Sequence, residues 1–118
     1  MIILRPLLTK QGEWFMEQLC SWLEGQSGGV RTYIEFQKKS AHLAQKDQAN
    51  GSLYILLGMV AQRFSNRYDG EPLPVDTATA ALKEFAALLR RASDLADKDA
   101  ELQLRFLNEI ATLDLTTA

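Results

Sequence analysis

The chain has 118 residues, of which 47% are hydrophobic and 24% are charged, values near the averages for soluble globular domains. Its net charge of -2 excludes a chain-wide basic field for nucleic acid. A single cysteine, Cys20, excludes an intramolecular disulfide and a cysteine-based metal cage. We expect one helical domain over residues 1–118, in the cytoplasm, because no signal peptide is evident and the longest apolar run, 53–61, is far short of the roughly 20 residues that span a bilayer.

The first elements are an N-terminal arm and a helix. Residues 1–8 read as a short extended or loosely coiled arm, and the apolar spacing predicts a helix over 10–24 with Thr9 as its N-cap. Trp14 projects from the middle of the polar face of this helix. Two interpretations stay open: the N-terminal arm covers Trp14, or Trp14 anchors a partner, as exposed tryptophans do at interface hot spots.

The segment 25–29 carries the pattern G-x-S-x-G. In hydrolases this pattern is a strained turn between a strand and a helix, supported by a histidine and an acid. Here a helix precedes it, and the chain's single histidine, His42, falls on the polar face of the following helix. We therefore interpret 25–29 as a linker between helices and His42 as a surface residue. A backbone anion-binding nest at the start of the next helix is a smaller alternative.

The next helix is predicted over 30–46, and one half of it is basic. Arg31, Lys38, Lys39 and Lys46 lie on that half, interrupted by Glu35. Together with Trp14, these four cations are the candidate partner-binding residues. As a nucleic-acid signal the face is weak, and the segment before it fits a helix-turn-helix only roughly.

A third helix is predicted over 53–68. Its first five residues are apolar on all sides, which indicates the central and most buried helix; a buried strand is the rival reading of that pentapeptide. Gly58 predicts the close approach of a neighbouring element. Residues 69–75 then form a loop whose prolines fix an extended path.

The last segment, 77–113, keeps one apolar helical face that includes Leu102 and Leu104, with Asp76 or Thr77 as its cap. One unbroken helix would be about 55 Å long, whereas a compact chain of this length is roughly 35 Å across. The alternative is a helical hairpin with a break near 94–99, where aspartates favour caps over helix interior. We favour the break; the unbroken helix would require a second copy of the chain.

The sequence therefore predicts an all-α, compact bundle of four to five helices. No residue set predicts catalysis, a cofactor or a metal site. The leading hypothesis is a small non-enzymatic interaction or regulatory protein whose partner is another protein or a second copy of itself. The alternative is a nucleic-acid-binding regulator that uses the basic face of residues 30–46.

Overall fold

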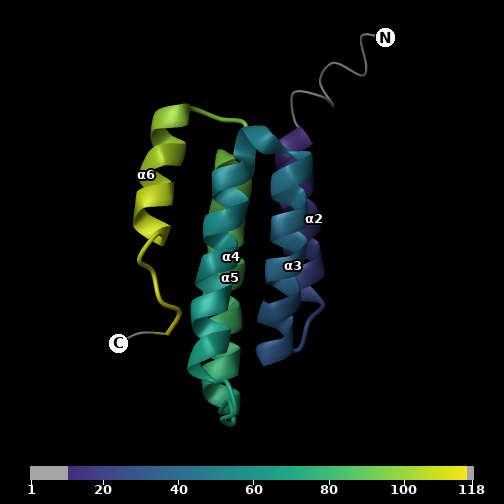
Figure 1. The fold of residues 1–118 in the computed structure, drawn as a ribbon, viewed down its shortest axis with the longest axis vertical. Coiled ribbons are helices and arrows are strands. Elements are labelled where there is room, and N and C mark those ends of the chain that lie inside the picture. The colour runs from purple at the N-terminus through teal and green to yellow at the C-terminus, as the bar shows by residue number, and fades with distance from the viewer. Residues whose placement is uncertain (1–10, 117–118) are drawn as a thin grey trace.

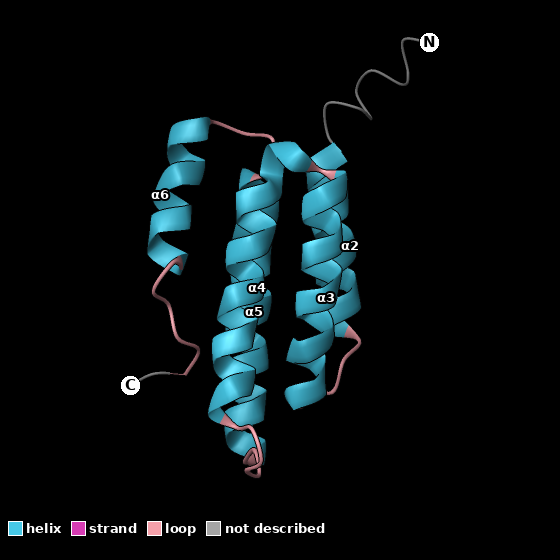
Figure 2. Ribbon diagram, viewed as in Figure 1, coloured by secondary structure: helices cyan, strands magenta, loops and turns pink. Residues whose placement is uncertain are grey.

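The computed structural model describes residues 11–116, and within that range it contains helices and no strand (Figures 1 and 2). The predicted all-α bundle is therefore confirmed, while the predictions for residues 1–8 and Thr9 lie outside the described residues. No helix within 11–116 is both long and apolar enough to cross a membrane. The elements are α2 (Gln11–Glu24), α3 (Val30–Lys46), the 3-10 helix η1 (Gln48–Asn50), α4 (Gly51–Arg67), α5 (Val75–Leu95) and α6 (Ala100–Ile110).

Helices α2 to α5 run alternately down and up, and they form two stacked pairs (Figure 1). Helix α3 packs most extensively on α4, and α2 packs most extensively on α5. The consecutive helices α2 and α3 approach each other much less closely. Helix α6 lies beside α4, outside the four-helix arrangement.

Aromatic side chains join the two pairs in the core. The ring of Tyr33 on α3 lies 4.6 Å from that of Phe64 on α4 and 5.5 Å from that of Phe85 on α5. Phe36 packs edge-on against Phe85, with ring centroids 4.8 Å apart. These rings are almost completely buried, and large apolar burial of this kind is the main favourable term in folding.

Small residues allow α3 and α4 to pack closely. A Cβ atom added at Gly58 would lie 2.7 Å from the Ser40 hydroxyl oxygen, which is too short for any real contact, so the predicted close approach at Gly58 is confirmed. The expectation that this helix is buried on all sides is wrong for one face, because Ile55 and Met59 are 46% and 41% exposed. In a stack of two helix pairs, each helix keeps one face toward solvent.

The chain breaks between α5 and α6, as favoured from the sequence. Asp97 takes a positive φ of 63°, a conformation that aspartate tolerates better than most residues. Asp99 then caps α6, because its carboxylate accepts a hydrogen bond of 2.7 Å from the Glu101 backbone N–H.

Two sequence expectations for this region are wrong. Leu102 and Leu104 are 49% and 57% exposed, because the reversal at the break turns part of the continuous apolar stripe to solvent. Helix α5 begins at Val75 with Pro74 as its N-cap, so neither Asp76 nor Thr77 is the cap.

A polar network connects the helix ends at the upper end of the bundle. The Asp97 carboxylate accepts hydrogen bonds from the backbone N–H groups of Gly12 (2.8 Å) and Glu13 (3.2 Å), so it caps α2 from a connector far away in sequence. The Asn50 side-chain amide donates to both Asp97 (2.9 Å) and Asp47 (3.0 Å). A Cβ atom at Gly12 would meet the side-chain ends of Asn50 and Asp97, so a larger residue there would displace this network.

Two arginines of α4 hold the C-terminal segment. The Arg63 guanidinium donates to the backbone carbonyls of Ile110 (3.1 Å) and Leu113 (2.8 Å), just where α6 ends. Arg67 donates to the carbonyl of Leu115 at 3.0 Å. Cations at the carbonyl end of a helix satisfy its unpaired acceptors and complement its dipole, so these contacts fix α6 against α4.

Candidate functional site

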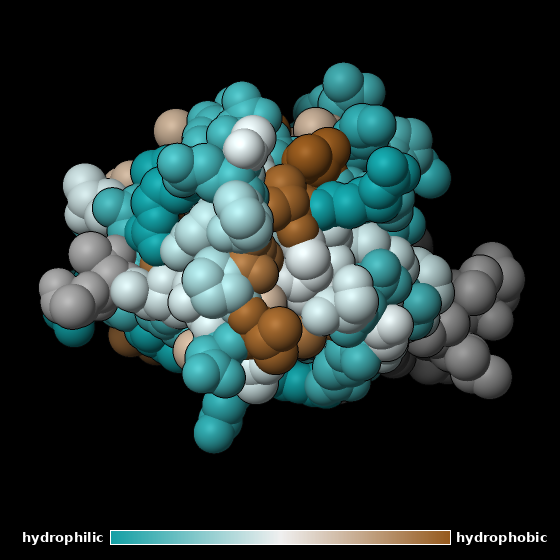
Figure 3. Space-filling view, turned by 90° about the horizontal axis from the view of Figure 1, so that it is seen from below, coloured by the Kyte–Doolittle hydropathy of each residue, from teal (hydrophilic) through white to brown (hydrophobic). Residues whose placement is uncertain are grey.

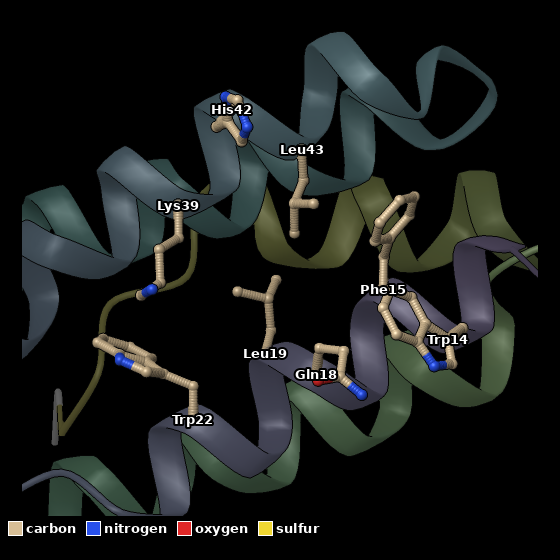
Figure 4. A pocket seen from close by; sticks show the side chains of 8 residues that line it. All are labelled: Trp14, Phe15, Gln18, Leu19, Trp22, Lys39, His42 and Leu43. Carbon is tan, nitrogen blue, oxygen red and sulfur yellow. The ribbon is translucent and has the colours of Figure 1, made fainter.

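A hollow lies between α2 and α3, and we call it the α2–α3 groove (Figure 4). Its volume is about 350 Å³, at the lower end of the range of ligand pockets. Its lining residues are Trp14, Phe15, Gln18, Leu19 and Trp22 from α2, and Lys39, His42 and Leu43 from α3.

The groove exists because consecutive helices belong to different pairs. Since α2 packs on α5 and α3 packs on α4, the space between α2 and α3 is bridged mainly by side chains. Figure 4 shows Leu43 pointing from α3 toward Leu19 on α2, and these two apolar side chains form the floor. Leu19 is buried and Leu43 half-buried, so the floor belongs to the core and is stable without a ligand.

One row of α2 supplies an aromatic wall. Trp14, Gln18 and Trp22 are spaced four residues apart, so they lie on one face of the helix. Trp14 is 55% exposed, and its ring meets that of Phe15 edge-on with centroids 5.3 Å apart. Trp22 is half-buried, and its ring centroid lies 6.5 Å from that of Phe36 in the core. The wall thus runs from an exposed tryptophan to one that the core holds in place.

The opposite wall, in the part of the chain that the structure describes, carries one cation, Lys39. The Lys39 ammonium lies 5.1 Å from the centre of the Trp22 ring, a cation–π geometry, and Figure 4 shows this side chain reaching across the groove. His42 is exposed one turn further along α3. Within residues 11–116, no ion pair involves a cation of α3, whereas α2's Glu24 is paired with Arg90 of α5 at 2.6 Å.

The structure brings together some of the predicted partner-binding residues and separates others. Trp14 and Lys39 both line the α2–α3 groove. Arg31 and Lys38 instead border a shallow hollow on the outer side of α3, beside the exposed Ile34. Lys46 is exposed in the last turn of α3 and lines none of these hollows.

Sequence reasoning missed six of the eight lining residues that the structure describes: Phe15, Gln18, Leu19, Trp22, His42 and Leu43. The sequence predicts His42 as a surface residue, and it does not single out Trp22. The spacing of Trp14 and Trp22, two helical turns apart, was the available signal for a shared wall. The spacing alone does not show that α2 pairs with α5, and this pairing leaves the Trp14–Trp22 side of α2 uncovered.

The G-x-S-x-G segment is a linker between α2 and α3, as interpreted from the sequence. Gly28 has a φ of +86°, and its N–H donates to the Thr32 hydroxyl at 3.3 Å. His42 is about 18 Å along α3 from the linker, so Ser27 has no histidine beside it. Among the described residues, no group of three or more histidine, cysteine or acidic side chains is arranged to hold a metal ion.

Apolar residues also reach the surface at the lower end of the bundle, where the α2–α3 and α4–α5 linkers lie. Figure 3 shows a line of apolar side chains across this end. Val75, the first residue of α5, is 78% exposed. This surface lacks the enclosed floor and the opposed walls of the α2–α3 groove.

Comparison of the sequence with known protein families, with curated proteins and with solved structures finds no match. The α2–α3 groove, with its apolar floor, two tryptophans and Lys39, is therefore the feature that bears on function.

Proposed function

We propose that this is a small non-enzymatic interaction protein that binds a segment of a partner polypeptide in the α2–α3 groove. The observation that carries the proposal is Trp14, which is 55% exposed at the edge of an apolar hollow. Leaving a tryptophan in water forgoes the burial of a large apolar surface. Binding a partner over Trp14 would recover that free energy.

The groove has an apolar centre and a polar rim, as protein interfaces do. Tryptophan is enriched at hot spots, which sit in well-packed pockets surrounded by polar groups. Here Leu19 and Leu43 provide the apolar centre, while Gln18, Lys39 and His42 provide a polar rim. The walls belong to helices of a packed bundle, so little conformational entropy would be lost when a partner binds.

The test is capture of partners from native lysate by the immobilised protein and by matched variants. Trp14→Ala removes the exposed anchor, and we expect specifically captured proteins to fall at least about tenfold, as for a hot-spot truncation. Leu104→Ala is the control, because Leu104 is a similarly exposed apolar residue, 57% exposed, on α6. Equal capture by all three proteins would refute the groove as the binding surface.

A second candidate function follows from the cations of α3. Arg31, Lys38, Lys39 and Lys46 are exposed on this helix, and within the described chain none forms an ion pair, so they are free to contact phosphates. A gel-shift titration with random duplex DNA at 50 mM and 200 mM salt tests this function. A salt-sensitive shift that Lys38→Glu weakens and Trp14→Ala leaves unchanged would favour it over the polypeptide partner.

A further inference from the structure

We infer that the occupant of the α2–α3 groove is an acidic amphipathic helix of a partner protein, about two to three turns long. The inference rests on the proposed function and adds the shape and charge of the bound segment. Three features of the groove carry it: the length of its aromatic wall, the charge of its α3 wall and the neutrality of its α2 wall.

The length of the wall matches a short helix. Trp14 and Trp22 are eight positions apart on α2, which corresponds to about 12 Å along the helix axis. A bound helix that anchors apolar residues at positions i, i+4 and i+7 covers about 10.5 Å. The apolar floor of Leu19 and Leu43 lies between the two tryptophans, so the middle anchor would pack there.

The α3 wall selects negative charge. Lys39 and His42 line the groove from α3. Lys46 continues their row beyond the groove, and Glu35 lies four residues before Lys39 on the same row. Within residues 11–116, Lys39 forms no ion pair. An acidic side chain on one flank of the bound helix would meet Lys39, and this attraction would steer association.

As far as the structure describes it, the α2 wall presents no acidic side chain that would repel an acidic helix. Gln18 is the polar residue of that wall, and the acidic residues of α2 lie on other sides of the helix. Glu24 is directed to Arg90 of α5, with 2.6 Å between the paired atoms, and Glu17 is one position before the Gln18 row. Among the described lining residues, the charged one is therefore Lys39 on α3, and an acidic helix would turn its acidic flank toward α3.

The experiment is selection from a phage-displayed library of 16-residue helical peptides against the wild-type protein, with Trp14→Ala used for counter-selection. We expect the enriched peptides to be net acidic, with apolar residues at i, i+3 or i+4, and i+7. Synthetic versions of these peptides are then titrated by fluorescence polarisation.

Charge reversal provides the sharper readout. Lys39→Glu should weaken binding of the selected peptides at least tenfold, and raising the salt from 50 to 500 mM should weaken wild-type binding in the same direction. Lys83→Glu is the matched control, because Lys83 is an exposed lysine on α5 outside the groove. The control variant should bind within twofold of wild type.

Two results separate failure of the inference from failure of the proposed function. If peptides that need Trp14 are selected but are neutral or basic, the groove binds polypeptides and the acidic helix is wrong. If no selected peptide depends on Trp14, the proposed function fails as well.

The other occupants give distinct outcomes. Light scattering that shows a dimer abolished by Trp14→Ala would assign the groove to a second copy. Peptide binding that appears only after deletion of residues 2–8 would assign it to the chain's own N-terminal segment. Either outcome overturns the inference.

Discussion

Two buried tyrosines differ in whether their hydroxyl group has a hydrogen-bond partner, and this difference changes what each hydroxyl contributes to stability. The Tyr54 hydroxyl donates a hydrogen bond of 2.7 Å to the Asp47 carboxylate, within the network that joins the upper helix ends. The Tyr33 hydroxyl is fully buried among the core aromatics, and within residues 11–116 it has no hydrogen-bond partner. Such an unpaired buried group costs about 1–3 kcal/mol.

The two tyrosines therefore predict opposite effects for the same substitution. Tyr54→Phe should lower the free energy of unfolding by about 1–2 kcal/mol, because it removes a bond to a buried carboxylate. Tyr33→Phe should leave the stability unchanged or raise it by about 1 kcal/mol, because it removes an unpaired hydroxyl. Urea denaturation at pH 7 measures both, and a loss above about 1 kcal/mol for Tyr33→Phe would contradict this account.

The same residues predict a loss of stability at alkaline pH. Burial raises the pKa of both phenols above the ordinary range, and for Tyr54 the hydrogen bond to Asp47 raises it further. Above a pH of about 10, tyrosines in the unfolded chain release their protons, while Tyr33 and Tyr54 stay protonated in the folded chain. Unfolding then releases protons, so the stability that is fully present below pH 10 falls as the pH rises.

The measurement is the urea midpoint of the wild type and of the double variant Tyr33→Phe/Tyr54→Phe at pH 8, 10 and 11. The wild type should lose more stability between pH 10 and 11 than the double variant does, by about 1 kcal/mol or more. Parallel losses in the two proteins would show that other groups govern the alkaline transition.

At the scale of elements, an arginine of α4 holds the carbonyl end of α6. Arg63 of α4 donates to the backbone carbonyls of Ile110 and Leu113, and it also pairs with Asp114 at 3.3 Å. Arg105, on α6 itself, makes within residues 11–116 only an exposed pair with Glu101 at 3.1 Å. A guanidinium that bonds several carbonyls at a helix end contributes more than an exposed ion pair one turn apart.

Arg63→Met should therefore lower the free energy of unfolding by about 1–2 kcal/mol, and Arg105→Met by less than about 0.5 kcal/mol. Hydrogen exchange provides the structural readout. In Arg63→Met, amides of α6 should exchange faster, while those in the middle of α3 and α4 keep their protection. Uniform loss of protection across all helices would contradict the local role of Arg63.

Elements with strong local signals were predictable from the sequence. The bounds of α3 agree with the prediction, because glycines precede it and a turn follows it. The break after α5 was predicted from an aspartate-rich stretch that favours caps, and Asp99 does cap α6. The capping of α2 by Asp97 was not predictable, because it joins residues 85 positions apart.

The candidate site was predictable only in part. Trp14 stood out because an aromatic residue on a polar helix face is unusual, and Lys39 stood out as one of four cations. Their meeting in one groove depends on which helices pair, and periodicity within each helix carries no information on pairing. The exposure of Leu104 was mispredicted for a related reason, since a reversal of the chain changes which face is covered.

At the scale of the whole molecule, the break between α5 and α6 allows the chain to cover its own core. Phe85 and Leu89 of α5 are fully buried, as are Ile110 of α6 and Tyr54 of α4. The apolar stripe that would have required a second copy in an unbroken helix is thus largely covered within one chain.

We therefore expect a monomer of 13.2 kDa in light scattering, at concentrations from 10 to 200 μM. A mass twice that value across the range would show that the exposed apolar residues form a homodimer interface.

The most direct test of the central claim, that the α2–α3 groove is the binding surface, uses the chain's two tryptophans. Each gives one indole N–H signal in a ¹H–¹⁵N correlation spectrum, and Trp22→Phe assigns them. On titration with a partner segment obtained by capture or selection, we predict that both indole signals and the amides of the facing sides of α2 and α3 shift, while those of α6 stay in place. Shifts confined to α6, or to the lower end around Val75, with unmoved indole signals, would contradict the account.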